Sequence, residues 1–577
     1  MSRKRVHGAR RVWLPAVVMG LFALAIVARL VQVQIIDHDY YAERAEAELS
    51  GSSVIYAERG ALLDRNGHVL ATSVDTWDIY VNSRAWRDDA DALEASAVLG
   101  AALDRDPAAL RQDVRDADLI DAIVARDVPF NVGLEIVEQQ LPGVIALRNT
   151  NRVHPEDDLA SGLLGITGTE NDGLSGVEAS LNGRLDGTPG RAIYERDTSG
   201  EPIPYGQYVA TEPEAGDDVV LTIDRYLQQL AEETLAKAVD RHRAKGGAII
   251  IMDPDTGEIL ALAEQPTIRY SELDLDDPSQ TPLLRNRTAT DLYEPGSVMK
   301  VVTAAAAIDA GAVSPHTTYV DDGTAEIYDT TIHNWDYRTY GEVTMTEVLQ
   351  HSINTGAIFM ADQLGAGRFH DYMDAFGFGQ ATGVGLPGEA EGIFREPGDP
   401  EWTEVDLATQ SFGQAISVTP VQMTTAIAAT INGGYLFQPR IVDAYVDSSG
   451  QRREIEPIVR GRPITEETSR AVQRMLEEVI YPGWDHQARP ELYTAGGKSG
   501  TANVPIPNGT YAEKQVASFV GFAPADDPEI LILVKLDENA DQLTGTQAAG
   551  PVFAKLVDET LGYMNLPPDG ARVSEGR

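Results

Sequence analysis

The chain of 577 residues contains no cysteine. A disulfide framework, a thiolate zinc site and a cysteine nucleophile are therefore all excluded. Histidine is scarce as well: there are ten, and none stands in a His-Glu-x-x-His spacing or another cluster typical of metal ligands. We therefore expect no metal site, and no cofactor is expected either.

Basic residues are also few. The chain has 46 Lys and Arg against 89 Asp and Glu, which gives a formal net charge of −43 at pH 7. Because such a surface repels a phosphate backbone, we expect no nucleic-acid partner. The hydrophobic share of 43% is enough for real cores, and the length predicts two or three domains.

A long hydrophobic run stands near the N-terminus. Residues 1–11 contain basic but no acidic side chains, Val12 to Ala28 carry no charge, and a second apolar stretch reaches Ile36. This pattern predicts a basic cytoplasmic tail (1–11), a transmembrane anchor (12–36) and an extracytoplasmic remainder. A cleaved signal peptide is the alternative, with a cleavage site at Ala23-Leu24-Ala25, but the apolar segment is longer than a usual signal core.

Residues 37–216 alternate short apolar runs with turn residues. Asp64 to Gly67, for instance, separates two apolar runs, which predicts a hairpin, and a helix is expected from Asp88 to Leu103. Since no pair of nucleophile and base stands out here, a structural or docking role is the best interpretation of this region.

Residues 217–564 predict an α+β domain with an antiparallel sheet flanked by helices. Asp224 is a natural N-cap for the helix that follows it. The tail, 565–577, is rich in Pro, Gly and charge, so we expect it to be disordered. The other elements expected are strands at Val219–Ile223, Ala248–Met252, Glu258–Ala263, Val516–Phe522 and Ile530–Leu536, and a helix at Val552–Leu561.

A serine with a lysine three residues on lies within this domain. Pro295 and Gly296 forbid a helix before Ser297, and the Ala/Val run after Lys300 favours one, so Ser297 is expected in the first turn of a buried helix. The spacing then places the Lys300 amine on the same face as the hydroxyl. A nucleophile with its own base is predicted, although such a pair is weak support alone.

Two further elements follow in order, Ser352-Ile353-Asn354 and Lys498-Ser499-Gly500-Thr501. The glycines before Lys498 also look like the end of a phosphate-binding loop, but Leu492 stands where that loop requires its earlier glycine, so we set this interpretation aside. For Ser352 and Asn354 the alternative is a helix cap. Each element is weak singly; the three in this order are strong.

The set resembles the penicillin-binding and serine β-lactamase superfamily, whose elements are S-x-x-K, S-x-N and K-[ST]-G. More closely it resembles the class B penicillin-binding proteins, the membrane-anchored transpeptidases of bacterial cell-wall synthesis. The resemblance runs from the membrane segment to about Leu561, and it implies a non-catalytic pedestal of the dimerisation type for 37–216 and a transpeptidase fold for 217–564. Further stretches that match are Arg59–Gly67, Gly173–Glu178, Met252–Glu258 and Ser411–Gln414.

The resemblance also implies roles for these residues. Ser297 is the nucleophile and Lys300 its base, which must be neutral part of the time, so burial and a nearby cation, Lys498, are expected to lower its pKa. Ser352 relays a proton to the leaving amine, and Asn354 holds the substrate amide. Lys498 and the hydroxyls of Ser499 and Thr501 bind the terminal carboxylate of the substrate, and Gly500 permits the peptide to approach closely. The N–H groups of Ser297 and Thr501 form the oxyanion hole.

The function expected is a serine-type D,D-transpeptidase that cross-links peptidoglycan stem peptides ending in D-Ala-D-Ala and is inhibited by β-lactams. A division role is favoured over elongation because of the length and compact pedestal. A SEDS-family glycan polymerase and other division or elongation membrane proteins are the partners implied, since no segment resembles a glycosyltransferase. A carboxypeptidase or β-lactamase, and a non-enzymatic β-lactam sensor or scaffold, are the alternatives; the pedestal and anchor argue against the former.

Overall fold

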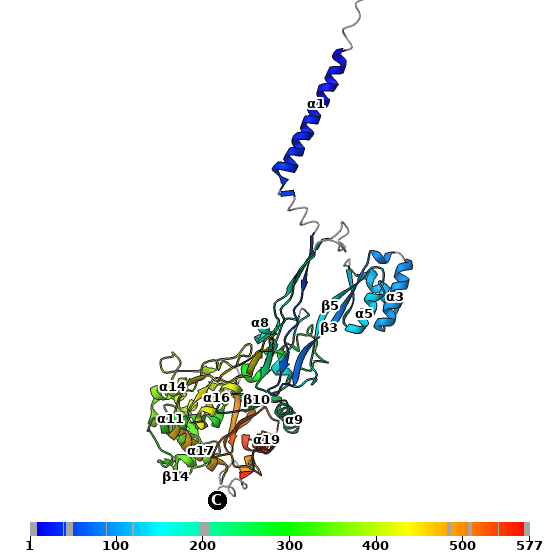
Figure 1. Cartoon of the computed structure of the whole chain (residues 1–577). Coiled ribbons are helices and arrows are strands. Elements are labelled where there is room, and N and C mark those ends of the chain that lie inside the picture. Colours follow the sequence, from blue (N-terminus) through cyan, green and yellow to red (C-terminus); the bar gives the residue numbers. More distant parts are fainter. Residues whose placement is uncertain are drawn as a thin grey trace, which may run out of the picture. The chain divides into compact units, whose positions relative to one another are not determined.

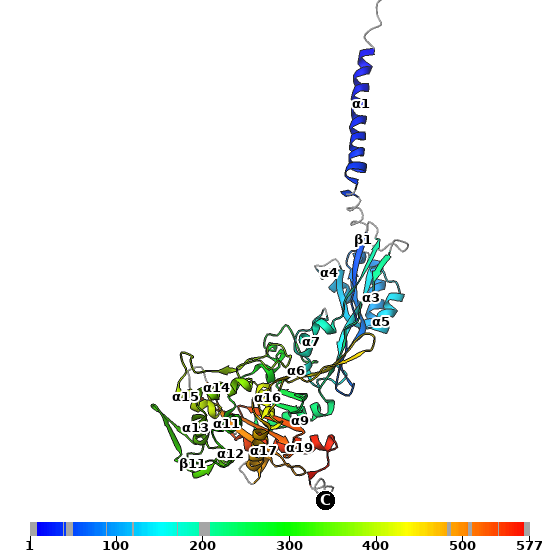
Figure 2. The same ribbon diagram turned by 60° about the vertical axis from the view of Figure 1, so that its left-hand side comes forward.

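The computed structural model describes ten stretches of the chain: residues 9–38, 40–41, 50–87, 89–117, 121–169, 171–195, 208–481, 486–505, 511–540 and 542–569. They fall into two compact units (Figures 1 and 2). The first consists of residues 1–58 and 187–215, and the second of residues 59–186 and 216–577.

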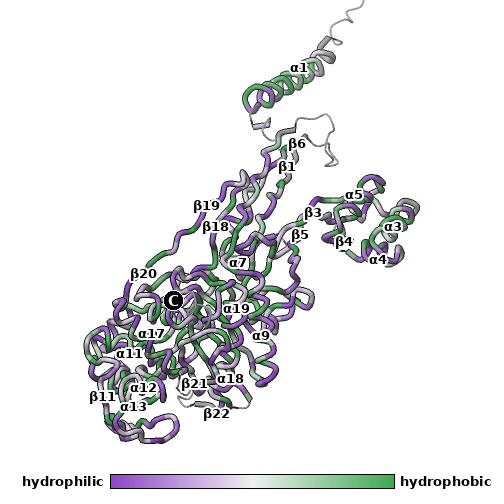
Figure 3. Tube along the Cα trace, turned by 60° about the horizontal axis from the view of Figure 1, so that its bottom comes forward, coloured by the Kyte–Doolittle hydropathy of each residue, from purple (hydrophilic) through white to green (hydrophobic). Residues whose placement is uncertain are grey.

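The first unit contains a long apolar helix. α1 (Ala9–Val31) continues into the π-helical turn η1 (Gln32–Ile36), and Figure 3 colours most of α1 as hydrophobic. Within the described residues, Trp13–Ile36 is the one stretch long and apolar enough to cross a membrane. Its large apolar side chains are exposed, as a lipid-facing helix requires. Residues 1–8 of the predicted basic tail lie outside the described residues.

The same unit holds a small antiparallel sheet. Its strand order is β1-β6-β7, with β1 at Ser50–Ile55, β6 at Gly190–Glu195 and β7 at Tyr208–Thr211.

The second unit begins with a sheet of seven strands. The predicted hairpin is confirmed: β2 (Leu62–Leu63) and β3 (Val69–Asn82) pair antiparallel. Asp64 closes its turn by accepting from the N–H groups of Asn66 and His68, both at 2.8 Å. The predicted helix is α3 (Asp89–Leu103), with residue 88 outside the described part. The other elements of this region are η2 (Ala85–Arg87), α4 (Pro107–Asp116), β4 (Asp121–Pro129), α5 (Phe130–Glu138), β5 (Val144–Val153), α6 (Ser161–Leu164), α7 (Gly176–Ser180) and α8 (Asn182–Leu185).

Strands from much later in the sequence complete this sheet. Its order is β19-β18-β8-β2-β3-β4, with β5 paired to β3. The strand expected at Val219–Ile223 is β8 (Asp218–Leu221), and it pairs with β2 and with β18 (Val442–Val446). It is not part of the sheet predicted for the transpeptidase domain, which is called the catalytic sheet below. The second of the late strands, β19, spans Arg452–Glu454.

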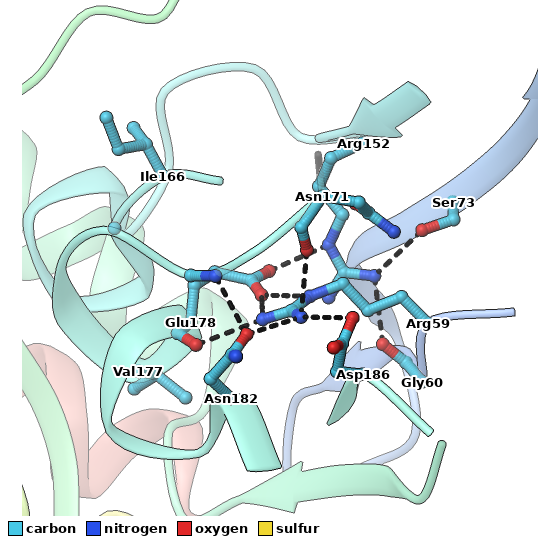
Figure 4. A network of polar contacts seen from close by, with 12 residues as sticks. Arg59, Gly60, Ser73, Arg152, Ile166, Asn171, Val177, Glu178, Asn182 and Asp186 are labelled. Atoms are coloured by element: carbon cyan, nitrogen blue, oxygen red, sulfur yellow. Dashed lines mark hydrogen bonds and ion pairs between the residues drawn. The ribbon is translucent and has the colours of Figure 1, made fainter. Parts of the chain in front are cut away.

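Two buried arginines share one buried glutamate beside β2 (Figure 4). Arg59 Nε donates to Glu178 Oε2 at 2.8 Å, and Arg152 Nε donates to Glu178 Oε1 at 2.7 Å. Arg59 Nη1 also donates to Asn182 Oδ1 at 2.8 Å, and Arg152 Nη1 donates to the Gly60 carbonyl at 2.9 Å. The network joins the two stretches Arg59–Gly67 and Gly173–Glu178, which lie more than a hundred residues apart.

Replacing Glu178 with alanine is expected to destabilise this part by about 3–5 kcal/mol, because it leaves two buried guanidinium groups without their shared anion. The measurement is the thermal unfolding of the detergent-solubilised full-length chain. Glu233→Ala is the matched control, since Glu233 pairs with Lys237 on the surface of α9 (Arg225–His242), where little change is expected. Equal melting temperatures for the two variants would contradict this view of the network.

The catalytic sheet has five antiparallel strands in the order β10-β9-β23-β22-β21. The predicted pairs are therefore confirmed. Alternate residues of its strands face two different cores: Ile249 and Ile251 pack with α9 and α19 on one side, and Ile250 and Met252 pack with α11 and α16 on the other. The bounds are β9 Gly246–Met252, β10 Ile259–Gln265, β21 Gly496–Pro505, β22 Tyr511–Ala523, β23 Ile530–Asp537, α11 Met299–Asp309, α16 Pro420–Ile431 and α19 Gly550–Tyr563.

Helices enclose this sheet on both faces, as predicted (Figures 1 and 2). Asp224 caps α9 as expected, accepting from Tyr226 N and Leu227 N. α11 has nine buried residues and is apolar almost all round, as a central helix should be. The remaining elements are η3 (Thr281–Leu284), α10 (Arg287–Thr290), η4 (Gly296–Val298), β11 (Thr318–Asp321), β12 (Thr324–Ile327), β13 (Thr330–His333), β14 (Gly341–Thr344), α12 (Met345–Gln350), α13 (Asn354–Leu364), α14 (Ala366–Ala375), β15 (Ile393–Phe394), α15 (Glu404–Ser411), β16 (Ile416–Ser417), β17 (Leu436–Phe437), β20 (Val459–Gly461), α17 (Glu466–Ile480), η5 (His486–Ala488) and α18 (Gly545–Ala548).

The start of the predicted disordered tail is placed against the domain. The Tyr493 hydroxyl donates to the Leu566 carbonyl at 2.7 Å, and Thr494 N donates to the Asp569 carboxylate. The prediction of disorder from residue 565 is thus wrong for its first residues, because local composition does not reveal these contacts with a distant segment. Residues 570–577 lie outside the described residues.

Candidate active site

Ser297 lies in a tight turn at the entrance to α11. The sequence predicts the first turn of the helix itself, but Gly296–Val298 form the 3₁₀ turn η4, and α11 begins only at Met299. Gly296 has a φ of +55°, which a residue with a side chain rarely adopts, and this sharp entry replaces a regular first turn. Ser297 is partly exposed while its neighbours are buried, so the turn presents this serine to incoming molecules.

Lys300 lies in the first turn of α11 and is fully buried. Its Nζ donates to the Ser352 carbonyl at 2.6 Å and to Asn354 Oδ1 at 2.7 Å, and it lies 3.2 Å from Ser352 Oγ. Burial, and after it the charge of Lys498, hold the pKa of Lys300 well below its ordinary value. Both causes expected from the sequence therefore act on this amine.

A neutral amine in this position has a defined orientation. It has two N–H bonds and one lone pair, and the two short contacts to carbonyl oxygens, on Ser352 and Asn354, use both N–H bonds. The lone pair is left for a hydroxyl proton. The arrangement can therefore accept a proton from a serine and return it through a second hydroxyl.

Ser352 and Asn354 come from the connection between α12 and α13. Ser352 has a φ of +56°, a conformation that is costly for a serine and often found where a site demands it. The helix-cap alternative is wrong: the N-cap of α13 is Ile353, with no side-chain cap of its own, and the side chains of Ser352 and Asn354 contact Lys300 instead.

The third element lies on β21, at the edge of the catalytic sheet. The phosphate-loop interpretation is excluded because these residues lie on a strand and not in a loop that leads into a helix. Lys498 is buried, and its Nζ donates to the Ser499 carbonyl at 3.2 Å and to Ser499 Oγ at 3.4 Å. Thr501 Oγ1 accepts from Gly545 N at 3.0 Å. The structure thus brings Lys300, Ser352 and Asn354 into contact and places Lys498 near enough to lower the pKa of Lys300.

Gly500 permits a close approach between β21 and other parts of this chain. A Cβ at this position would lie 2.8 Å from the Pro295 carbonyl and 2.4 Å from Ser518 Oγ. Only glycine lets β21 pack directly on the turn that carries Ser297.

Ser411–Gln414, a stretch with no role assigned from the sequence, supports the same turn. Gly296 N donates to the Gly413 carbonyl at 3.0 Å, and a Cβ on Gly413 would lie 2.1 Å from the Gly296 carbonyl. Glu294 Oε1 accepts from Ala415 N at 3.0 Å. The matching glycines at 296 and 413 are the sequence signal of this contact, but nothing local links them.

Two domain families match the chain. The one described as "Penicillin binding protein transpeptidase domain" matches residues 247–558, and the one described as "Penicillin-binding Protein dimerisation domain" matches residues 54–221.

Whole-length relatives agree with these domains. Stage V sporulation protein D of Bacillus subtilis is 32% identical over 94% of this chain and 84% of its own length. Peptidoglycan D,D-transpeptidase FtsI of Escherichia coli is 30% identical over 98% of this chain and 95% of its own. The crystal structure of penicillin binding protein 3 from Mycobacterium tuberculosis, complexed with aztreonam, has a TM-score of 0.69 and 27% identity, and the match covers 89% of this chain and 98% of that one.

The chain belongs to the class B penicillin-binding proteins. The α+β fold and the transpeptidase class predicted from the sequence are thereby confirmed. Within the described stretches, no group of three or more His, Cys, Asp or Glu side chains is placed to hold a metal ion.

Proposed function

We propose that this protein is a peptidoglycan D,D-transpeptidase that acts through an acyl-enzyme on Ser297. The observation that carries the proposal is the environment of Lys300: a fully buried amine with a lowered pKa, held by Ser352 and Asn354. A base of this kind is what a serine hydroxyl needs to attack a peptide carbonyl at neutral pH.

The reaction follows from these groups. Ser297 Oγ attacks the carbonyl between the two D-Ala residues of a stem peptide while its proton passes to the Lys300 amine. The N–H groups of Ser297 and Thr501 stabilise the resulting oxyanion, each such donor contributing about 10²–10³ in rate. The intermediate then collapses: the C–N bond breaks, the terminal D-Ala amine takes the proton through Ser352, and an ester to Ser297 remains.

The second half of the reaction, in which an amine attacks the acyl-enzyme, repeats these steps in reverse. An amine of a neighbouring stem peptide gives its proton to the same relay and attacks the ester, which forms the cross-link and frees Ser297. Lys498 and the hydroxyls of Ser499 and Thr501 bind the terminal carboxylate of the donor peptide, and Asn354 holds its amide. A β-lactam would acylate Ser297 in the same way; the similar penicillin binding protein 3 is complexed with the β-lactam aztreonam, which supports β-lactam binding.

The test separates transfer from hydrolysis. Purified full-length protein is incubated with a D-Ala-D-Ala stem or thioester analogue, with and without a D-amino acid acceptor, and both products are counted. The exchange product should exceed the hydrolysis product when the acceptor is present, because a positioned amine reacts with the acyl-enzyme faster than water does. Rapid turnover of penicillin, or hydrolysis unaffected by acceptor, would instead favour a β-lactamase or carboxypeptidase.

For the rest of the chain we propose a non-catalytic pedestal at 37–216, a catalytic domain at 217–564 and a single-pass anchor with its N-terminus in the cytoplasm. The excess of basic residues before α1 supports this orientation. A SEDS-family polymerase is the proposed partner and septal synthesis the proposed role, with elongation as the alternative. A fluorescent fusion seen along the side wall rather than at midcell would overturn the septal role.

A further inference from the structure

The helix that carries Asn354 is capped from a distant segment. The first N–H groups of a helix have no partner within it, and the N-cap residue of α13, Ile353, has no side-chain acceptor to offer. Asn334 supplies it: its Oδ1 accepts from Asn354 N at 3.0 Å and from Thr355 N at 3.2 Å. Asn334 follows β13, twenty residues upstream, so the cap comes from outside the helix.

A buried carboxylate holds this amide in place. Asn334 Nδ2 donates to both oxygens of Asp321, at 3.1 and 3.0 Å, and to the Arg338 carbonyl at 3.0 Å. Asp321 also accepts from Tyr340 N at 2.7 Å and from the Thr355 hydroxyl at 2.6 Å. Because Asp321 only accepts, the amide has one allowed orientation, with its oxygen toward α13. Asp321, Asn334 and Thr355 are all buried.

The network ends at the amine of Lys300. Asn354 Nδ2 donates to the His333 carbonyl at 3.0 Å, next to Asn334, while Asn354 Oδ1 accepts from Lys300 Nζ at 2.7 Å. The backbone and the side chain of Asn354 are thus fixed by the residue after β13 and by the last residue of β13, respectively. Ser352, whose carbonyl also binds Lys300, lies two residues earlier on the same connection.

We propose that Asn334, oriented by Asp321 and with Thr355 as the link to α13, is a positioning residue that sets the geometry of Lys300 by fixing Ser352 and Asn354. The inference rests on the proposed function, since it assigns Asn334 to the same acylation step. It does not make Asn334 a group that touches substrate. When this positioning is lost, we expect the acylation rate to fall by about 10-fold to 100-fold, as it does when a catalytic group is slightly misplaced.

The first test is Asn334→Asp in the full-length protein, with the rate of acylation by a fluorescent penicillin measured against pH. The new carboxyl would lie about 3 Å from the Asp321 carboxylate, so the pair would share one proton until the pH passes the strongly raised pKa of the second carboxyl. The acylation rate of the variant should therefore fall furthest below that of wild type at high pH. The difference between the two rates should narrow as the pH falls, because a bound proton then restores a donor between the two carboxyls. The other charged or titratable groups near this network are Tyr319, Asp322, His333, Asp336, Arg338 and Tyr340, together with Lys300 through Asn354, and they are common to both proteins.

A second pair of variants keeps the inference testable if Asn334→Asp does not fold. Thr355→Val removes only the hydroxyl that donates to Asp321, whereas Thr355→Ser keeps it. We expect Thr355→Val to acylate at least about tenfold more slowly and Thr355→Ser to stay near wild type. Folded variants that acylate like wild type, with an unchanged pH profile, would overturn the inference. Wild-type protein that fails to acylate at all would instead refute the proposed function.

Discussion

Lys300→Arg is expected to lose most of its acylation by penicillin, by about 10²–10⁴-fold, the usual contribution of a general base. The guanidinium keeps the positive charge but cannot give up its proton, so no lone pair is available for the hydroxyl of Ser297. The measurement is the second-order rate of labelling by a fluorescent penicillin. Lys237→Arg is the matched control, because Lys237 is exposed on α9 and its change should leave the rate unaltered.

The pH dependence of the wild type belongs to the same test. Burial and Lys498 lower the pKa of Lys300, so the neutral amine forms at a lower pH than for an ordinary lysine. The acylation rate should rise with pH through that lowered pKa and then level off, and Lys300→Arg should show no such rise. A variant within tenfold of wild type would show that Lys300 serves only as a structural cation.

Ser297→Ala is expected to abolish the penicillin adduct completely, since the ester forms on its hydroxyl oxygen. Trypsin cleaves after Arg287 and Lys300, and the peptide between these sites, Thr288 to Lys300, contains Ser297 as its one serine. The added mass of penicillin on this peptide therefore assigns the modified serine, because the peptide holds no second serine from which Ser297 must be distinguished.

Ser499→Ala is the control for this assignment. Ser499 is a serine on the neighbouring strand β21, and its variant should still carry the adduct on the peptide with Ser297, although more slowly. Adduct that persists in Ser297→Ala would remove the assignment of the nucleophile and with it the proposed mechanism.

Local patterns predicted much of this fold correctly. The turn at Asp64, the cap at Asp224 and the strands of the catalytic sheet depend on residues close together in the chain, so alternation and turn chemistry suffice to find them. The lowered pKa of Lys300 was also predictable, because burial follows from the apolar run after it and Lys498 is the cation of a recognisable element.

Contacts between distant segments were not predictable from the sequence. Ser297 lies in a 3₁₀ turn where Gly296 packs closely on Gly413 and on β21, and no local pattern encodes that crowding. The pairing of β8 with β2 and the cap of α13 by Asn334 have the same origin. Turn-rich composition around Asn334 identifies a loop but not the helix that this loop serves.

The seven-stranded sheet has a consequence for synthesis of the chain. Three of its strands, β8, β18 and β19, follow residue 216, and the last of them ends at Glu454. The sheet therefore cannot be completed until the ribosome has translated the chain as far as Glu454, even though β2 and β3 emerge early. A fragment cut at residue 216 would expose an unpaired edge at β2, and such edges invite aggregation. The sheet that starts at β2 thus depends on strands from much later in the chain for its own completion.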